Sequence, residues 1–116
     1  MRVITHKSTY RVGDGDIRLV IRIGDGQFGS SLVIVGDHVF PHVREFSENL
    51  GKGAALVGQL IDAASIVTDV IKETNRTSVT YELTGGPGGA SVHTSMFTVE
   101  KDNDSVQFNA EIELVS

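Results

Sequence analysis

The chain contains no cysteine and no tryptophan, and it has only four histidines and two prolines. Without thiolates it can form neither disulfides nor cysteine-based zinc or iron–sulfur sites. Aromatic side chains make up only 6% of the residues. Surfaces that stack on nucleic-acid bases or on sugar rings need exposed aromatic side chains, so both kinds of recognition lose support.

Positive charge is also scarce. Ten Lys and Arg residues against fifteen Asp and Glu residues give a formal net charge of -5. Only Arg18 and Arg22 share one face of an expected strand, which is too few for the clustered basic surface that neutralises phosphates. No apolar run approaches the ~20 residues that span a membrane. We therefore expect neither a nucleic acid nor a membrane as a partner.

The remaining composition is typical of one globular domain. The 116 residues are 40% hydrophobic and 22% charged, and a chain of this length buries roughly 65% of its unfolded surface. We expect a single domain over residues 1–116. The first twelve residues contain no continuous apolar segment of the secretory type. If Met1 is the native start, the lack of such a segment predicts a cytoplasmic protein. The prediction would not hold for a chain that had been trimmed at its N-terminus.

Alternation of apolar and polar residues, typical of a strand with one buried side, is the clearest pattern in the sequence. It occurs at residues 16–23, 77–84 and 106–114, and a further strand is expected at 91–100. Residues 30–35 are almost continuously apolar, which predicts a strand covered on both faces. Short strands separated by turn residues every 8–12 positions indicate an all-β fold, an antiparallel sandwich or barrel of about 7–8 strands.

Three segments are harder to assign. Residues 2–5 suggest a short, fraying edge strand, 43–46 suggest another, and 47–53 resemble a loop. Residues 54–71 fit an amphipathic helix by the spacing of their apolar residues. A β-branched cluster near Ile66 and a glycine at position 58 favour extended structure instead. We favour strands there. The alternative is an α+β fold with one helix at 54–71 packed on an antiparallel sheet.

The stretch from Gly24 to Gly29 has the spacing of a dinucleotide-binding loop, Gly-x-Gly-x-x-Gly. That loop needs a helix after its last glycine, because the helix N-terminus holds the pyrophosphate. Residues 30–35 predict a strand there. We therefore interpret 24–29 as a hairpin turn and expect no cofactor.

Asp37, His38 and His42 are the candidate metal ligands, because one carboxylate and two imidazoles can bind a divalent cation. Pro41 lies between the histidines and argues against the helix that usually places such a pair on one side. The acidic turns at residues 14–16 and 102–104 resemble fragments of calcium loops. They lack the rest of an EF-hand pattern, and turn chemistry accounts for their acids.

Phe40, Tyr81, Gly86 and Gly88 are the candidate ligand-binding residues. The two glycines belong to Gly85–Gly89, a glycine-rich connection around a proline, and function concentrates in loops. Phe40 and Tyr81 are the aromatic residues that would line a deep apolar pocket, with the glycine-rich loop and the bend at 37–42 as its rim.

No grouping of Ser, His and Asp at recognisable spacing predicts nucleophilic catalysis, and there is no Gly-x-Ser-x-Gly elbow. We therefore expect a non-catalytic interaction or structural protein that assembles as a homo-oligomer, or with a protein partner, through sheet faces or edges. Two alternatives are open. One is a module that binds a small molecule or a glycan, and the other is a metal-dependent enzyme that uses His38 and His42.

Overall fold

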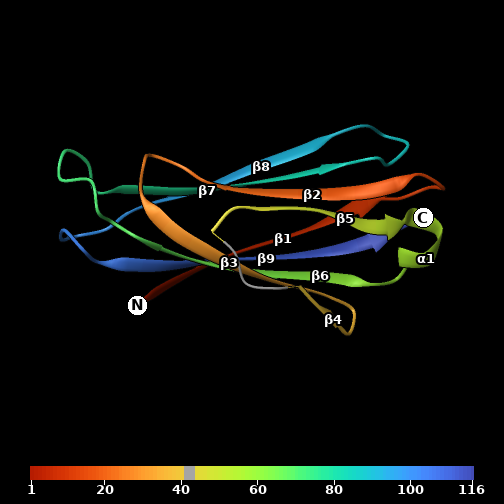
Figure 1. Ribbon diagram of the computed structural model, residues 1–116, viewed down its shortest axis with the longest axis horizontal. Helices are drawn as coiled ribbons and strands as arrows, with labels where there is room; N and C mark the ends of the chain where they lie inside the picture. Colours follow the sequence, from red (N-terminus) through yellow and green to blue (C-terminus); the bar gives the residue numbers. More distant parts are fainter. Residues whose placement is uncertain (41–43) are drawn as a thin grey trace.

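Alternating apolar residues give most strands one buried side, and two sheets share that interior. The computed structural model describes residues 1–40 and 44–116 (Figure 1). The strands are β1 (Arg2–Arg11), β2 (Asp16–Ile23), β3 (Phe28–Val35), β4 (His38–Val39), β5 (Phe46–Lys52), β6 (Leu60–Thr68), β7 (Arg76–Thr84), β8 (Ser91–Thr98) and β9 (Ser105–Val115). A single helical turn, α1 (Gly53–Leu56), precedes β6.

The strands form a five-stranded sheet in the order β1-β9-β6-β3-β4 and a four-stranded sheet in the order β5-β2-β7-β8. Every neighbouring pair is antiparallel except β1 and β9, which run parallel from Arg2 opposite Val106 to Arg11 opposite Val115. The predicted all-β sandwich is confirmed. The expected edge strand at 2–5 in fact continues to Arg11, because β9 offers it a partner along its whole length.

The alternative α+β fold is wrong, because half of residues 54–71 form strand β6 and the only helix there is the single turn α1. This strand pairs with β3 on one side and β9 on the other. It buries Ile61, Ala63, Ser65 and Val67 on one face. The apolar spacing that mimicked a helix arises from residues on both faces of the strand. The β-branched residues fit a pleated sheet better than a helix.

The turn at 24–27 is tight, but the hairpin assigned to it is wrong. Asp25 and Gly26 have φ values of 56° and 70°, and the amide of Gln27 donates a 3.2 Å hydrogen bond to the Gly24 carbonyl. The turn carries the chain from β2 in one sheet to β3 in the other. The connection at residues 99–104 likewise leads from β8 to β9 across the sandwich.

Two other expectations need correction. Residues 30–35 are not covered on both faces: Ser31 and Val33 lie inside, whereas Leu32 is 38% exposed on the outer face. The expected loop at 47–53 is largely strand β5, which pairs with β2 from Phe46 to Lys52. Polar side chains are compatible with a strand there, because β5 lies at the edge of its sheet and exposes one face to solvent.

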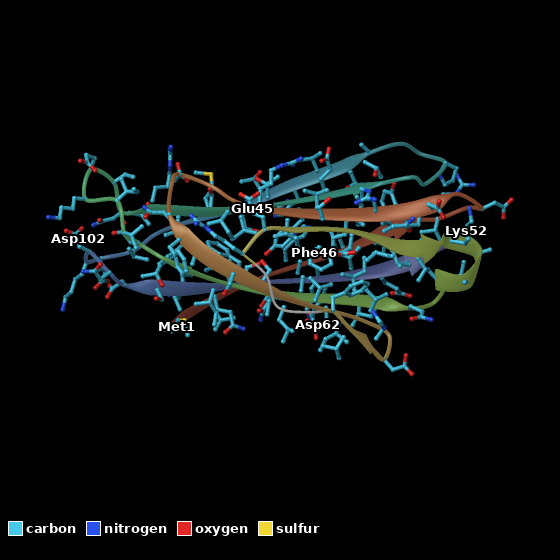
Figure 2. All side chains as sticks on the ribbon, in the orientation of Figure 1. Met1, Glu45, Phe46, Lys52, Asp62 and Asp102 are labelled. Carbon is cyan, nitrogen blue, oxygen red and sulfur yellow. The ribbon has the colours of Figure 1, made fainter. Side chains whose placement is uncertain are left out.

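The core fills the space between the two sheets (Figure 2). Its largest fully buried side chains are Phe46, Phe108, Ile17, Leu19, Ile21, Ile61, Leu114, Val33, Val67, Val79, Val106 and Thr77. Ser31 and Ser65 are polar residues on its wall, and their hydroxyl oxygens lie 2.6 Å apart. One hydroxyl donates a hydrogen bond to the other, so both buried polar groups have a partner. No helix in the described residues is long and apolar enough to cross a membrane.

Candidate functional site

One end of the sandwich is organised by Gln27, a side chain that is only 2% exposed. Its Oε1 accepts hydrogen bonds from the amides of Val70 at 2.7 Å and Ile71 at 3.0 Å. Its Nε2 donates to the carbonyls of Thr74 at 3.3 Å and Arg76 at 3.1 Å. One side chain thus supplies backbone partners to both sides of the loop between β6 and β7, because an amide has two donors and an acceptor.

The same turn holds the start of β7 through Asp25. The Oδ1 atom of Asp25 lies 2.9 Å from Nη2 and 3.0 Å from Nε of Arg76, and Oδ2 accepts a 2.8 Å hydrogen bond from Ser78. The side chain of Asp25 is only 16% exposed, so its charge needs these partners. The sequence from Gly24 to Gly29 therefore fastens the two sheets together at this end.

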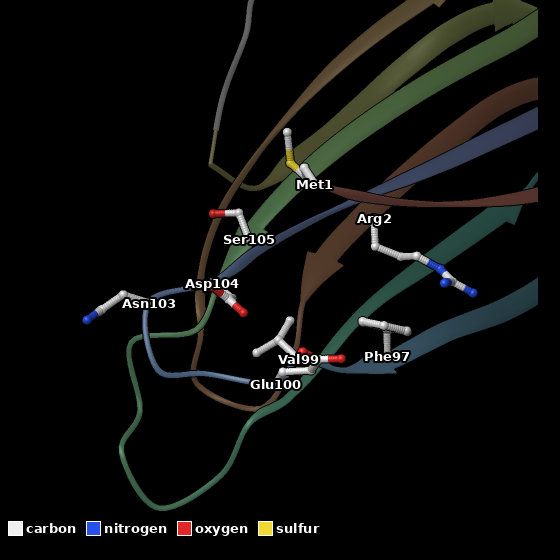
Figure 3. A pocket seen from close by; sticks show the side chains of 8 residues that line it. All are labelled: Met1, Arg2, Phe97, Val99, Glu100, Asn103, Asp104 and Ser105. Carbon is white, nitrogen blue, oxygen red and sulfur yellow. The ribbon is translucent and has the colours of Figure 1, made fainter.

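Beside these loops lies a cavity of about 480 Å³ that opens to solvent (Figure 3). It is lined by Met1, Arg2, Phe97, Val99, Glu100, Asn103, Asp104 and Ser105. The Arg2 guanidinium lies 5.4 Å from the centre of the Phe97 ring, within range of a cation–π contact. The lining combines both signs of charge and contains no histidine.

A second cavity, of about 250 Å³, lies at the seam where β1 of one sheet approaches β8 of the other. It is lined by His6, Ser8, Thr9, Tyr81, Leu83, Ser91, Val92, His93 and Ile112. The imidazoles of His6 and His93 are stacked, with ring centres 3.5 Å apart and planes inclined by 6°. Burial, and then the adjacent His93, lower the pKa of His6 below its ordinary value. The stack is therefore suited to neutral rings, since two imidazolium ions would repel.

Tyr81 is the most unusual residue of this seam. It is 2% exposed, and its buried hydroxyl forms no hydrogen bond of good geometry among the described residues, although the Ser65 side chain lies close enough to act on its pKa. Burial raises the pKa of the Tyr81 phenol above its ordinary value. An unpaired buried hydroxyl costs free energy, so it needs an explanation such as a bound polar molecule.

The structure separates the other predicted ligand-binding residues from Tyr81. Phe40 packs edge-on against Phe46 of the core, with ring centres 5.4 Å apart, and it does not line the seam cavity. Gly86 lies against the carbonyl of Arg11, where a Cβ atom would collide. Gly88 has open space around its Cα. Neither glycine lines the seam cavity.

The glycine-rich connection joins β7 and β8, which are antiparallel neighbours, and Tyr10 anchors it. The Tyr10 hydroxyl donates a 2.6 Å hydrogen bond to the carbonyl of Gly89 and accepts one of 2.9 Å from the amide of Gly86. Tyr10 itself is 6% exposed. The loop is therefore held to the end of β1 by a buried side chain.

The predicted metal ligands are only partly described. Asp37 is exposed in the turn between β3 and β4, and His38 is exposed as the first residue of β4. The His38 ring packs edge-on against Phe40, with ring centres 4.5 Å apart. His42 lies outside the described residues. Within 1–40 and 44–116, no group of three or more His, Cys, Asp or Glu side chains is placed to hold a metal ion. Binding by these three residues stays a prediction.

One histidine contacts a serine, as a nucleophile and its base must. Nε2 of His93 lies 3.1 Å from Oγ of Ser95. Ser95 is buried, at 8% exposed, and in the described part of the chain no carboxylate forms a hydrogen bond or ion pair with His93. The pair lacks both the access and the orienting third group of a hydrolytic triad.

The outer surface of the five-stranded sheet carries a cluster of apolar side chains. We call this cluster the apolar face; it comprises Phe28, Leu32 and Ile34 on β3, Val39 on β4, and Ala64 and Ile66 on β6. Phe28 is 52% exposed and Val39 is 56% exposed. Strand register makes these residues neighbours, with Leu32 opposite Ala64 and Ile34 opposite Val39.

The strand edge beside this face is also open. β4 pairs only with Ile34 and Val35 of β3, and the Phe40 amide donates to the carbonyl of Val33, so in the described chain no strand pairs with the outer edge of β3 from Phe28 to Leu32. The Arg44 guanidinium lies 5.2 Å from the centre of the exposed Phe28 ring. Asp62, at the other end of the face, lies opposite Ile34.

Comparison with protein-family models, with curated proteins and with solved structures found no match in any of the three. The site must therefore be interpreted from its own geometry.

Local sequence does not predict the roles of Gln27 and Tyr10 or the His6–His93 stack. Gln27 stands in a turn where a polar residue is ordinary, and its four partners lie more than 40 positions away. The two stacked histidines are 87 positions apart and belong to different sheets. Nothing in local spacing indicates such contacts. For Tyr10, the only signal in the sequence is the presence of one isolated tyrosine and, far along the chain, one glycine-rich loop.

Proposed function

We propose that this protein is a non-catalytic interaction module that associates with a second copy of itself through the apolar face. The single observation that carries the proposal is the exposure of the face: Phe28, Leu32, Val39 and Ile66 are between 38% and 56% exposed. Contiguous apolar surface on a folded domain marks interaction sites, whereas isolated exposed apolar residues need no explanation.

The size of the face sets the strength of the association. From Phe28 to Ile34 it extends six residues, or ~20 Å, and three strands give it a width of ~15 Å including side chains. That area of roughly 300 Å² is less than the ~800 Å² that each partner buries in a standard stable interface. Polar residues of β9 and β1 must therefore contribute, and we expect a dimer that dissociates at micromolar concentrations.

Charge selects the orientation of the second copy. Arg44 lies at the Phe28 end of the apolar face and Asp62 at the Ile34 end. A twofold axis perpendicular to the strands places Arg44 of each copy near Asp62 of the other. The resulting contact is isologous, as the commonest homodimers are. Such rim charges contribute more to orientation than to affinity.

Sedimentation equilibrium over a concentration series tests this proposal. Leu32→Lys introduces a charge in the centre of the apolar face and should shift dimerisation to at least tenfold higher concentration. Val92→Lys is the matched control, because Val92 is a 60% exposed strand residue on the outer face of the other sheet. Equal effects of the two substitutions, or a monomer throughout the series, would refute the proposal.

A charge exchange tests the orientation separately. Arg44→Asp and Asp62→Arg should each weaken the dimer, because each places like charges together. The double variant should recover the wild-type association. If the double variant is as weak as the product of the single effects, the two residues do not meet and the proposed axis is wrong.

A second candidate function, binding of a small polar molecule at the seam, is favoured by one observation. Tyr81, whose buried hydroxyl lacks a hydrogen bond of good geometry, lines a cavity together with two histidines. Its volume of about 250 Å³ is below the ~300 Å³ lower limit of typical ligand pockets, so only a small ligand fits. A polar fragment library screened by protein NMR should give shifts at His6 and His93 that Tyr81→Phe abolishes. A screen without hits at the seam would remove this candidate.

A further inference from the structure

The seam cavity between β1 and β8 has one polar level, formed around two imidazoles. Strand register places His6 of β1 opposite Ala110 of β9. It likewise places His93 of β8 opposite Tyr81 of β7. The two imidazoles meet across the seam, with ring centres 3.5 Å apart. His93 contacts Ser95, but none of the hydrogen bonds formed by the described side chains involves the His6 ring. The nitrogens of His6 are therefore available to a bound molecule.

A second level of the cavity lies two residues further along the strands, or ~7 Å away. Here Ser8 lies opposite Ile112, and Ser91 lies opposite Leu83. All four residues line the cavity. Leu83 and Ile112 are buried, at 3% and 4% exposed, so the walls of this level include aliphatic side chains as well as hydroxyls. The cavity is thus polar at one level and partly apolar at the other.

The residues that line this cavity include no carboxylate. Glu82 follows Tyr81 on β7, but it lies on the outer face of its sheet and forms an ion pair with Arg22 at 3.3 Å. Glu111 follows Ala110 on β9 and forms an ion pair with Lys7 at 3.6 Å, also on an outer face. Tyr81 is the remaining titratable group of the lining, and burial raises its pKa, so its phenol stays neutral. The two imidazoles therefore have no counter-ion inside the cavity.

An anion would change the protonation of these rings. Burial, and then the adjacent His93, lower the pKa of His6, because two positive rings would repel each other. A neutral imidazole both donates and accepts hydrogen bonds, whereas an imidazolium only donates. A negative group placed beside the rings accepts charge-assisted hydrogen bonds from the imidazolium form and stabilises it. Binding of an anion is therefore linked to the uptake of a proton.

We propose that the seam cavity binds a short-chain aliphatic carboxylate. Its carboxylate group lies beside His6 and His93, and its alkyl chain lies beside Leu83 and Ile112. This inference rests on the second candidate function, binding of a small molecule at the seam, and names the chemical class of that molecule. An inorganic oxyanion would satisfy the imidazoles but leave the aliphatic wall without a contact.

The volume of the cavity limits the length of the chain. About 250 Å³ corresponds to roughly eight water-sized groups at about 30 Å³ each. A carboxylate with four carbons has six non-hydrogen atoms and fits, whereas a long fatty acid does not. The ligand is small, and the formal net charge of -5 opposes an anion. We therefore expect a dissociation constant on the order of 1 mM.

Proton NMR of the four histidine rings tests the proposal on the full chain. Butyrate is titrated at constant ionic strength, and butyramide is the uncharged compound of the same shape. Butyrate should shift the signals of His6 and His93, raise the midpoints of their pH titrations, and bind at least about threefold more tightly at pH 5.5 than at pH 7.5. Acetate and sulfate should bind more weakly, because each methylene contributes about twofold to fourfold in affinity.

The outcomes separate this inference from the candidate function on which it rests. Butyramide that binds at the seam as tightly as butyrate would refute the anionic class and leave a site for small uncharged molecules. Sulfate that binds as tightly as butyrate would refute the placement of the alkyl chain. No shift of His6 or His93 with any of these compounds would overturn the inference. Together with a fragment screen without hits, that result would remove the candidate function as well.

Two variants locate the effect, and a third is the control. His6→Gln and His93→Gln each keep a polar side chain but remove one titrating ring, so butyrate should bind more weakly and with less dependence on pH. The changes lie on different strands, so each variant checks the result of the other. His38→Gln removes an exposed ring from β4, at the opposite edge of the five-stranded sheet from β1, and should bind as the wild type does. Wild-type pH dependence in both seam variants would refute the site.

Discussion

Replacement of Gln27 by alanine should be among the most damaging single changes in this chain. It deletes four hydrogen bonds, two accepted by Oε1 and two donated by Nε2. A typical hydrogen bond contributes about 1 kcal/mol net, and an unsatisfied buried group costs more. The loop lies near the surface, so water can replace some partners. We expect a loss of about 2–4 kcal/mol in the free energy of unfolding.

That loss is large against the stability of the domain. At about 0.05–0.15 kcal/mol per residue, the free energy of unfolding of a chain of this size is roughly 6–17 kcal/mol. A loss of 2–4 kcal/mol should lower the melting temperature by roughly 10–15 °C. Urea unfolding followed by circular dichroism measures the change directly, since two-state analysis applies to small single domains.

Gln107→Ala is the matched control for this experiment. Gln107 is half-buried on the outer face of β9 and makes one side-chain hydrogen bond, to Oδ1 of Asn109 at 2.8 Å. Its loss should cost less than about 1 kcal/mol. If Gln27→Ala costs no more than Gln107→Ala, the loop does not depend on Gln27 and the reasoning fails.

An isosteric change separates hydrogen bonding from shape. Gln27→Glu keeps the two bonds accepted from Val70 and Ile71 but directs a carboxylate oxygen at the carbonyls of Thr74 and Arg76. The variant should be destabilised at neutral pH and recover part of its stability in acid, because a protonated carboxyl can donate again. An unchanged stability at neutral pH would contradict the assigned orientation of Gln27.

Three further predictions concern stability. Ser31→Ala or Ser65→Ala alone should lower the free energy of chemical unfolding by about 1–3 kcal/mol, because each leaves a buried hydroxyl unpaired. The double variant should lose less than the sum of the two single losses. Additive losses would contradict the hydrogen-bonded pair. Tyr10→Phe should cost about 1–3 kcal/mol by removing both hydrogen bonds of its hydroxyl, and an unchanged urea midpoint would show that the loop is held otherwise. Because folding lowers the pKa of His6, its contribution to the free energy of unfolding should be fully present above the unfolded pKa near 6.5 and should fall as pH decreases through the folded pKa. His6→Gln should flatten this pH dependence of unfolding. An unaltered slope would contradict the role of the His6–His93 stack.

The fold class could be predicted because alternation with a period of two appears along most of the chain. Ile17, Leu19 and Ile21 are buried as their spacing indicates, and so are the alternate residues of β9. The pattern shows which residues face inward but not which strand is the neighbour. For that reason the parallel pair β1–β9 and the crossing at Gly24–Gly29 could not be deduced from local sequence.

The sequence-based predictions that the structure corrects share this physical origin. The apolar residues Leu32 and Ile34 predict that Ser30–Val35 is buried on both faces, but apolar composition does not reveal whether a second layer covers the outer face. Loop composition concealed β5 at 46–52, because a solvent-facing edge strand tolerates polar residues and glycine. Contacts between distant loops, such as Gln27 with Val70 and Arg76, depend on how the two sheets end. They have no signature in local sequence.

Concentration-dependent NMR of the amide signals tests the central proposal, association through the apolar face, most directly. Backbone amides of a ¹⁵N-labelled sample are followed as the protein is diluted from hundreds to a few micromolar. We predict shifts concentrated in β3 and β6 around Leu32 and Ile66, with β5 and β8 unchanged. Shifts confined to β8 or β5, or spectra that do not change with concentration, would contradict the account.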